Sequence, residues 1–442
     1  MGYQNMSYDQ DVLSGQSEFI FPAVRPLYDT PLVLKEGQGV RVRDVDGREY
    51  LDLFAGILTT SVGHCNPKVI ARMSEQLGKL GHTSTLYVTE PQVEAAGRLA
   101  SIAPGELSQT FFTNSGTEAI ESAIQMAFVH TGRSEVIGIR QAYHGRSFMT
   151  SNLTAVGSWR PLATSFPGIK HVQTPYPYRC PYKQPCDESC SEKFAADIED
   201  VIRTTTNGEP AAFIAESVMG VGGYIVPPKG YLERAAEIIR SYGGLFISDE
   251  VQSGFGRSGD HWFGIEHSGV EPDIMVMAKG IANGAPVGAM TTRPEIAESW
   301  TAKTISTFGG NPISMAAASA TMEVMIEETP KNKNVPQRAS EQGGQLLVGL
   351  QKLQNHFDWI GDVRGRGLML GLELVENGEE KKPFPAKAKR LLEACKEEGL
   401  LVGIGGLYGH VIRLGPSLLV TPSEIEEGLE RFGRACHKLE DR

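Results

Sequence analysis

The chain has 442 residues, of which 40% are hydrophobic, and its formal net charge is -11. This length supports one large core and a smaller one, so we expect two lobes. The charge is spread without acidic or basic blocks, which argues against a nucleic-acid surface and favours a small-molecule ligand. The first residues lack a basic start followed by an apolar segment, and no apolar run reaches membrane-spanning length. We therefore expect a cytoplasmic protein without membrane contact.

Residues 1–62 predict a β-hairpin near their end. Residues 40–43 and 50–54 flank Asp46-Gly47, a dipeptide typical of a type I′ turn. We expect this N-terminal segment to join the small lobe.

Apolar runs alternate with helical patterns through residues 63–325, which we predict to be the large lobe. Such alternation is typical of βαβ units with a mostly parallel sheet that helices cover on both faces. The runs are Thr110–Phe112, Val136–Ile139, Ala211–Ile214, Leu245–Ile247 and Ile274–Met277.

Residues 326–442 have a different pattern. Long amphipathic helices are predicted at 337–353, 386–398 and 422–439, with short strands at 368–374 and 410–414. We predict that these residues form a smaller α+β lobe.

Three of the six cysteines, Cys180, Cys186 and Cys190, lie in a segment rich in Pro and Tyr. They could bind a metal ion with a fourth ligand such as His171, but zinc-binding cysteine pairs usually lie closer in sequence. The alternative is a surface insertion, and from the sequence we assign no metal.

Residues 112–124 pass from a short strand through a hydroxyl-rich turn into a helix. Ser115, Gly116 and Thr117 form the turn. Free backbone N–H groups, hydroxyl groups and the helix dipole suit a single phosphate, although ordinary helix capping by Ser115 is the simpler alternative. After the next predicted strand, Tyr143-His144-Gly145-Arg146 offers an aromatic ring for stacking and a guanidinium for a carboxylate.

Asp249 and Lys279 each follow an apolar run. Both should lie at the carboxyl edge of a parallel sheet, where α/β proteins bind ligands. A buried salt bridge between them is one interpretation. Together with the phosphate site and Tyr143, however, they match pyridoxal 5'-phosphate, which uses a Lys for a Schiff base and an Asp at its ring nitrogen.

Residues 254–259 match the dinucleotide-binding pattern Gly-X-Gly-X-X-Gly. Asp260, His261 and Trp262 follow where an apolar helix should begin, so we interpret the match as accidental.

The chain resembles class III aminotransferases, the omega-transaminase family, which have the type I pyridoxal-phosphate fold. The motifs that carry this resemblance are Leu53–Gly56, Ser61–Cys65 and Gly361–Met369. The resemblance covers about residues 31–432 and favours the alanine–glyoxylate aminotransferase 2 branch. It implies an α/β large lobe, pyridoxal 5'-phosphate, and a homodimer that can pair into a tetramer. It also implies ping-pong transfer from an amine, ω-amino acid or alanine-type donor to pyruvate or glyoxylate.

The same resemblance implies roles for individual residues. Lys279 forms the Schiff base and moves the proton, and Asp249 pairs with the ring nitrogen. Tyr143 and Val251 lie on the two ring faces. The other implied cofactor contacts are Gln252 at the phenolic oxygen, Ser115, Gly116 and Thr117 at the phosphate, Thr307 from the partner subunit, and His144 and Glu216.

A departure from related branches points to the substrate site. In the ornithine and 4-aminobutyrate branches, a Glu five residues after the position of Glu216 pairs with the Arg at the position of Arg413. Here Val221 stands there. An unpaired buried guanidinium attracts an anion, so we expect Arg413 to bind the carboxylate of the 2-oxo acid, with Arg146 as its competitor.

Ile57, Leu58 and Tyr87 should form an apolar pocket for the amine tail. The alternative function is a pyridoxal-phosphate-dependent lyase acting on a phosphorylated amino alcohol. That lyase needs a second basic phosphate pocket, which we do not identify in the sequence.

Overall fold

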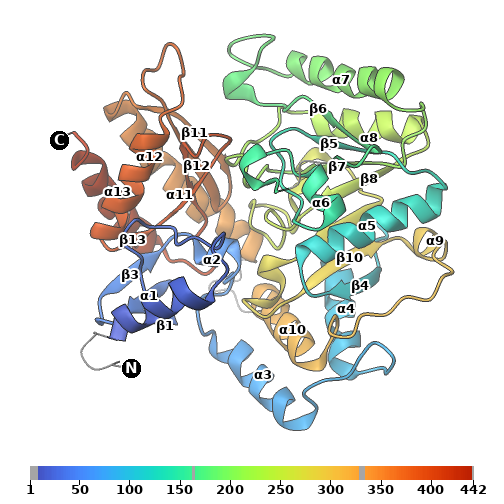
Figure 1. The fold of residues 1–442 in the computed structure, drawn as a ribbon, viewed down its shortest axis with the longest axis horizontal. Coiled ribbons are helices and arrows are strands. Elements are labelled where there is room, and N and C mark those ends of the chain that lie inside the picture. Colours follow the sequence, from blue (N-terminus) through green and yellow to red (C-terminus); the bar gives the residue numbers. More distant parts are fainter. Residues whose placement is uncertain (1–7, 162–164, 328–333, 441–442) are drawn as a thin grey trace.

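A seven-stranded sheet lies at the centre of the larger part of the molecule (Figure 1). The computed structural model describes residues 8–161, 165–327 and 334–440. The strand order is β4 (Gln109–Thr113), β10 (Gly288–Thr292), β9 (Ile274–Met277), β8 (Leu245–Asp249), β7 (Ala212–Glu216), β5 (Val136–Ile139) and β6 (Ile169–Val172). The strands from β9 to β6 are parallel, and β10 is antiparallel to both of its neighbours.

Alternating side chains connect the sheet to two apolar clusters. Phe213 and Phe246 pack into a cluster with α7 (Ser189–Thr205), α8 (Tyr231–Ser241) and α10 (Pro312–Glu327). Ile214 and Ile247 pack into the other cluster with α5 (Gly116–Thr131). Because both faces are buried, these strands are apolar along their whole length in the sequence.

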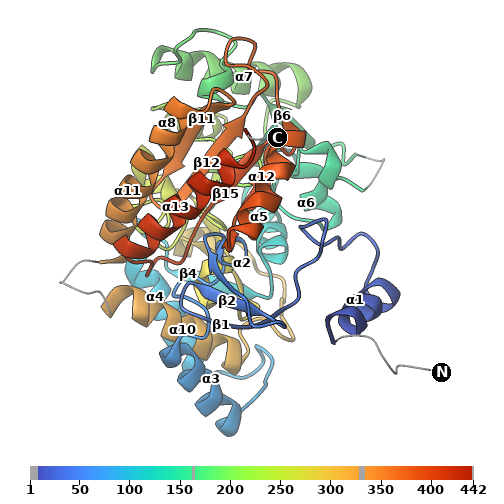
Figure 2. The same cartoon turned by 90° about the vertical axis from the view of Figure 1, so that its left-hand side faces the viewer.

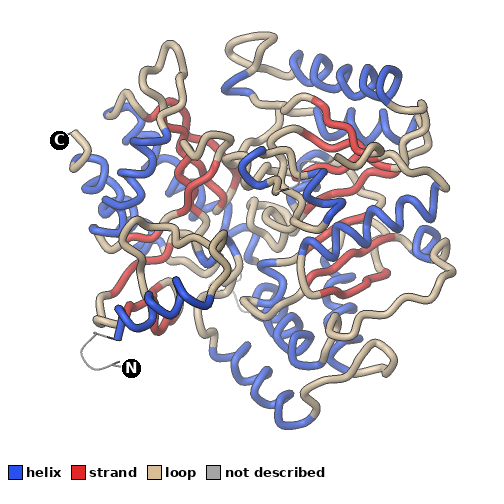
Figure 3. Tube along the Cα trace, in the orientation of Figure 1, coloured by secondary structure: helices blue, strands red, loops and turns tan. Residues whose placement is uncertain are grey.

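Two smaller sheets form the other lobe, which lies on the left in Figures 1 and 3. The first contains β1 (Leu34–Gln38), β2 (Arg41–Asp44), β3 (Glu49–Asp52) and β13 (Leu400–Leu401). The second has the order β11 (Ile360–Arg366), β12 (Met369–Leu374), β15 (Val411–Leu414) and β14 (Gly403–Gly405). Helices α11 (Val335–His356), α12 (Pro385–Glu397) and α13 (Pro422–His437) lie beside one another in Figure 2.

The other helices and the short 3-10 turns complete the described part of the chain. They are α1 (Tyr8–Phe19), α2 (Ala55–Leu58), α3 (Pro67–Lys79), α4 (Glu90–Ile102), α6 (Phe148–Leu153) and α9 (Pro294–Ala297), with 3-10 turns η1 (Gly157–Trp159), η2 (Pro177–Arg179), η3 (Gly264–Ser268) and η4 (Lys279–Ala282). Within the described ranges, no helix is long and apolar enough to cross a bilayer.

The predicted, mostly parallel sheet of the large lobe is confirmed. The N-terminal hairpin joins the C-terminal lobe as expected, because β3 pairs in parallel with β13. The type I′ turn is wrong: Gly47 has φ 80°, but Asp46 does not share the positive φ that this turn requires at both positions. No crossover helix follows residues 254–259, where turns lead into η3. The boundaries after residues 62 and 325 stay predictions.

Candidate active site

A cavity of about 340 Å³ lies at the carboxyl ends of the parallel strands. Asp249 is the last residue of β8, and Lys279 lies two residues beyond β9, the neighbouring strand. Nine of the predicted cofactor residues line this cavity together with Lys279: Ser115, Gly116, Thr117, Tyr143, His144, Glu216, Asp249, Val251 and Gln252. Segments far apart in the sequence therefore meet at one edge of the sheet, as parallel topology requires.

The carboxylate of Asp249 is paired with His144 and not with Lys279. His144 Nδ1 donates to Asp249 Oδ2 at 2.7 Å, and the Val251 amide donates to Oδ1 at 3.1 Å. Both side chains of the His144–Asp249 pair are buried. Burial opposes the imidazolium, but the hydrogen bond and charge of Asp249 outweigh it and raise the pKa of His144. The hydrogen bond therefore fixes the orientation of the Asp249 carboxyl group at the cavity.

Glu216, at the end of β7, positions the neighbouring backbone. Its Oε1 accepts from the Tyr143 amide at 3.0 Å and its Oε2 from the Gly220 amide at 2.8 Å. Burial and the charge of Asp249 raise the pKa of Glu216 to about 7. Its carboxyl group therefore gains or loses a proton near neutral pH.

Lys279 begins η4 with a positive φ of 41°. Within the described residues the Lys279 amine forms no ion pair. This excludes the salt bridge between Lys279 and Asp249 that the sequence allowed. Burial lowers the pKa of Lys279, and the charges of Asp249 and Glu216 only partly oppose this. A lysine with a lowered pKa supplies a neutral, nucleophilic amine.

The turn before α5 has the arrangement expected of an anion site. Ser115 caps the helix, with its Oγ accepting from the Glu118 amide at 3.2 Å. The capping alternative is therefore correct for the Ser115 oxygen. Because Ser115, Gly116 and Thr117 line the cavity at a helix N-terminus, this turn also suits an anion. At Gly145 (φ 129°), a Cβ would lie 2.7 Å from Thr117 Oγ1, so the next loop approaches this turn closely.

Tyr143 and Val251 line the cavity from separate loops. Tyr143 packs edge-on against Trp159, with ring centroids 5.6 Å apart, and burial raises its pKa. Gln252 is 7% exposed, and within the described residues its Oε1 has no hydrogen-bond partner. An unpaired amide oxygen in a cavity indicates a place where a ligand donates a hydrogen bond.

Arg413 is buried on β15 next to this site. Its Nη1 donates to the Gly220 carbonyl at 3.4 Å, and its Nε and Nη2 donate to the Ile404 carbonyl at 3.2 and 2.8 Å. Phe54 and Tyr224 lie under the guanidinium, at 5.2 and 5.7 Å from their ring centroids. Within the described residues no carboxylate pairs with Arg413, and burial lowers its pKa.

Six predicted residues do not line the cavity of this chain: Arg413, which lies beside it, and five others. Arg146, Tyr87 and Thr307 are exposed, Ile57 is 46% exposed, and Leu58 is buried among apolar side chains. Their roles stay predictions.

Sequence reasoning missed Glu250, which is fully buried beside Asp249. Its Oε1 accepts from Ser217, Ser248 and the Ile265 amide, and its Oε2 accepts from Ser253 and the Gly264 amide, at 2.7–3.0 Å. Glu250 thereby fixes the loop after β8. Other cavity residues that the sequence did not identify are Thr59, Asn114, Ile120, Gly145, Ala278 and Gly284–Val287.

Known proteins resemble this chain over nearly its whole length. The sequence profile of the family "Aminotransferase class-III" matches residues 24–436. Human mitochondrial alanine–glyoxylate aminotransferase 2 is 39% identical over 454 residues, covering 98% of this chain and 87% of that protein. Because that relative is mitochondrial by name, cytoplasmic location of this chain stays a prediction.

Solved structures agree with the sequence comparison. An aminotransferase from Bacillus anthracis superposes with a TM-score of 0.90 at 29% identity, covering 98% of this chain and 100% of that one. An (S)-enantioselective omega-transaminase from Thermomicrobium roseum has a TM-score of 0.89 at 31% identity, covering 99% and 100%. The expected α/β fold of the type I transferases is confirmed.

Proposed function

The chain belongs to the class III aminotransferase family, and from this premise we propose that it moves an amino group from an amine, ω-amino acid or alanine-type donor to pyruvate or glyoxylate. The observation that carries the choice of acceptor is the buried Arg413, which within the described residues lacks a carboxylate partner. The cofactor of this transfer is pyridoxal 5'-phosphate, and the reaction is ping-pong.

The cavity suits this cofactor. It combines a helix N-terminus for a phosphate, a carboxylate for a ring nitrogen and an amine for an aldehyde. His144 Nε2 and Gln252 Oε1 are buried without partners among the described residues, which supports a polar ligand between them. When bound, pyridoxal phosphate supplies an aldehyde for the amino group and a ring that withdraws electrons from the reacting carbon.

The residues of the chain have separate tasks in this mechanism. Ser115, Gly116 and Thr117 hold the phosphate, while Tyr143 and Val251 lie against the two faces of the ring. Asp249, oriented by its hydrogen bond from His144, would keep a proton on the ring nitrogen. Gln252 contacts the phenolic oxygen.

Lys279 attaches the cofactor through its amine. Once released, the same amine would move the proton from the donor carbon, and the burial that lowers its pKa favours the neutral form that can accept this proton. The second half-reaction runs through the same residues in reverse. Because the enzyme keeps the amino group after the first product has left and before the 2-oxo acid binds, the kinetics are ping-pong.

The acceptor carboxylate binds Arg413. The guanidinium reaches the Gly220 carbonyl, and Gly220 also contacts Glu216 through its amide, so Arg413 lies directly beside the cavity wall. The Arg413 guanidinium contacts two carbonyl groups and two aromatic rings, which carry no formal negative charge. A substrate carboxylate would supply the missing counter-charge. Arg146 is exposed, so water screens its charge. An ion pair between Arg146 and a carboxylate therefore contributes less binding free energy.

We assign the active unit to a homodimer. The Thr85 amide donates to the Ser306 carbonyl at 3.5 Å, so the loops that carry Tyr87 and Thr307 form one surface. This surface exposes Leu86, Tyr87, Val88, Ile305 and Phe308, an apolar group of the kind that protein interfaces cover. Pairing of two chains here brings the partner's Thr307 to the phosphate and Tyr87 to the substrate entrance.

Kinetics of Arg413→Ala and Arg146→Ala test the proposal. Loss of Arg413 should raise KM for pyruvate by about 30-fold or more, because removal of one partner of a buried charge pair costs at least about 2 kcal/mol. KM for a simple amine should change little, and Arg146→Ala serves as the matched control. Equal effects of Arg413→Ala on both substrates contradict the assignment. Phosphate release from phosphoethanolamine would instead indicate the lyase.

A further inference from the structure

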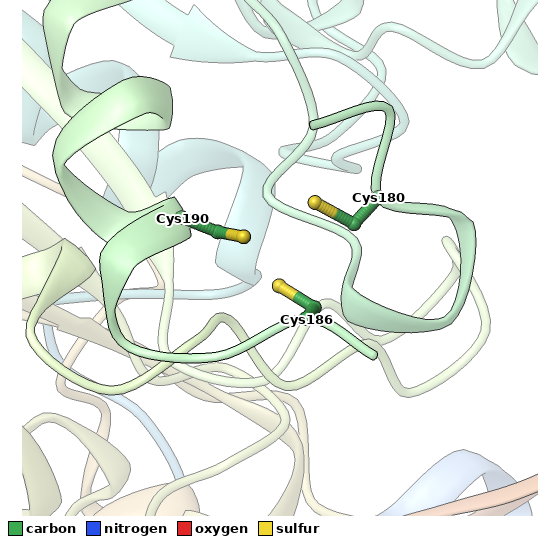
Figure 4. A group of neighbouring side chains, drawn as sticks. All are labelled: Cys180, Cys186 and Cys190. Carbon is green, nitrogen blue, oxygen red and sulfur yellow. The ribbon is translucent and has the colours of Figure 1, made fainter. Parts of the chain in front are cut away.

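Three sulfur atoms lie together far from the cavity. Cys180 follows η2, Cys186 lies in the next loop, and Cys190 is in the first turn of α7. The three Sγ atoms are all within 4.8 Å of one another. Figure 4 shows the side chains pointing from three backbone segments toward a common point. The sequence spacing of six and four residues did not predict this convergence.

Few side chains of the loop that carries these cysteines reach the core. Residues 181–185 and 187–189 are exposed, Cys186 is half-buried, and Cys180 and Cys190 are buried. Tyr182 packs edge-on against Phe194, and the Gln184 amide donates to the Pro177 and Cys180 carbonyls. A metal ion held by the three cysteines would add a further link between this loop and α7.

The surroundings of the sulfurs suit negatively charged ligand atoms. The backbone amides of Tyr182 and Lys183 donate to the Cys180 sulfur. Cys190 lies in the first turn of α7, at the positive end of the helix dipole. Three thiolates this close together would repel one another unless a cation lay between them.

We propose that Cys180, Cys186 and Cys190 bind one zinc ion through three thiolates, with a water molecule as the fourth ligand. Sulfurs 2.3 Å from a tetrahedral zinc lie about 3.8 Å apart, which the observed grouping reaches by small side-chain rotations. Binding one Zn²⁺ displaces three thiol protons. Zinc therefore replaces the thiol contacts with three metal–sulfur bonds that tie the loop to α7.

Other ligand sets fit less well. His171 is not part of the sulfur group, because its Nε2 bonds to the Leu153 carbonyl at 3.0 Å. Iron–sulfur clusters are commonly held by four protein ligands, and among the described residues three cysteines form this group. Cys65 is exposed elsewhere, and Cys395 and Cys436 are buried in the smaller lobe. Soft thiolates together with a water position are typical of zinc.

Metal analysis of the purified holoenzyme tests this proposal. After expression in zinc-supplemented medium, mass spectrometry of the metals should find about one zinc per chain in wild type and near none in Cys186→Ser. Cys65→Ser, with its exposed thiol outside the cluster, is the matched control and should retain zinc. In addition, wild type stripped of metal by a chelator should develop a thiolate-to-cobalt charge-transfer band when Co²⁺ is added.

Three results overturn the proposal. They are wild-type protein without zinc and without the cobalt band, equal zinc content in wild type and Cys186→Ser, and peptide mapping that finds a disulfide between two of the three cysteines. The cobalt titration uses only wild-type protein, so it decides the matter even where Cys186→Ser fails to fold. None of these measurements depends on aminotransferase activity.

Discussion

Replacing His144 tests how the chain positions Asp249 for the proposed cofactor. His144→Leu removes a 2.7 Å hydrogen bond between buried groups and leaves Asp249 with one donor, the Val251 amide, among the described residues. A hydrogen bond to a charged group contributes about 1.5–3 kcal/mol. The Asp249 side chain loses that support, so we expect the dissociation constant of pyridoxal phosphate to rise about 10- to 100-fold.

The assay is a fluorescence titration of cofactor-free protein with pyridoxal phosphate. His144→Asn is the matched control, because the Asn amide can donate to Asp249 from nearly the same position as Nδ1. Both variants lose ring volume, and only His144→Leu loses the donor. We expect His144→Asn to stay close to wild type. If the two variants weaken binding equally, lost packing explains the effect and the hydrogen-bond argument is refuted.

Two further predictions concern the neighbouring residues. Lys279→Ala should lower turnover with pyruvate by at least about a thousand-fold, since it loses both attachment and proton transfer, while the protein still binds cofactor; normal turnover would refute its role. Glu216 has a pKa raised from 4.5 to about 7 by folding, so its contribution is fully present below pH 4.5 and is lost as the pH rises through 7. In urea unfolding, wild type should therefore lose up to about 3 kcal/mol relative to Glu216→Gln between these pH values, and parallel pH curves would contradict this.

The sequence predicts those parts of the fold that local patterns specify. The runs at Val136–Ile139 and Ile274–Met277 match β5 and β9 residue for residue, because strands buried on both faces need continuous apolar sequence. The strand Gly288–Thr292 was not predicted, since Gly-Ala-Met-Thr-Thr has neither an apolar run nor alternation. Its place between β4 and β9 comes from tertiary pairing.

The candidate site shows the same limit at the level of single residues. Asp249 and Glu250 are adjacent acids after one strand, and the sequence offers no reason to prefer either from composition alone. Successive side chains of extended backbone point in opposite directions, so Asp249 lines the cavity while Glu250 accepts five hydrogen bonds on the other side. The pairing of His144 with Asp249 joins residues 105 positions apart, and only the fold brings them together.

The cysteine loop and Arg413, the proposed substrate-binding residue, are connected through Glu373. On the paired strands β12 and β15, Gly371 lies opposite Arg413 and Glu373 opposite Val411. Arg179, directly before Cys180, donates to the buried Glu373 through Nε at 2.7 Å. Zinc at Cys180 would thus fix Arg179, and through Glu373 the strand pair that carries Arg413.

Loss of zinc should therefore affect acceptor binding more than chemistry. We expect Cys186→Ser to raise KM for pyruvate about 3- to 10-fold with little change in kcat, because a loosened strand pair costs about 1 kcal/mol at the guanidinium. Arg179→Ala should have a similar effect, and the double variant should be no worse than either single one, since both act through Glu373. Independent, additive effects in this double-mutant cycle would show that the loop and Arg413 are not coupled.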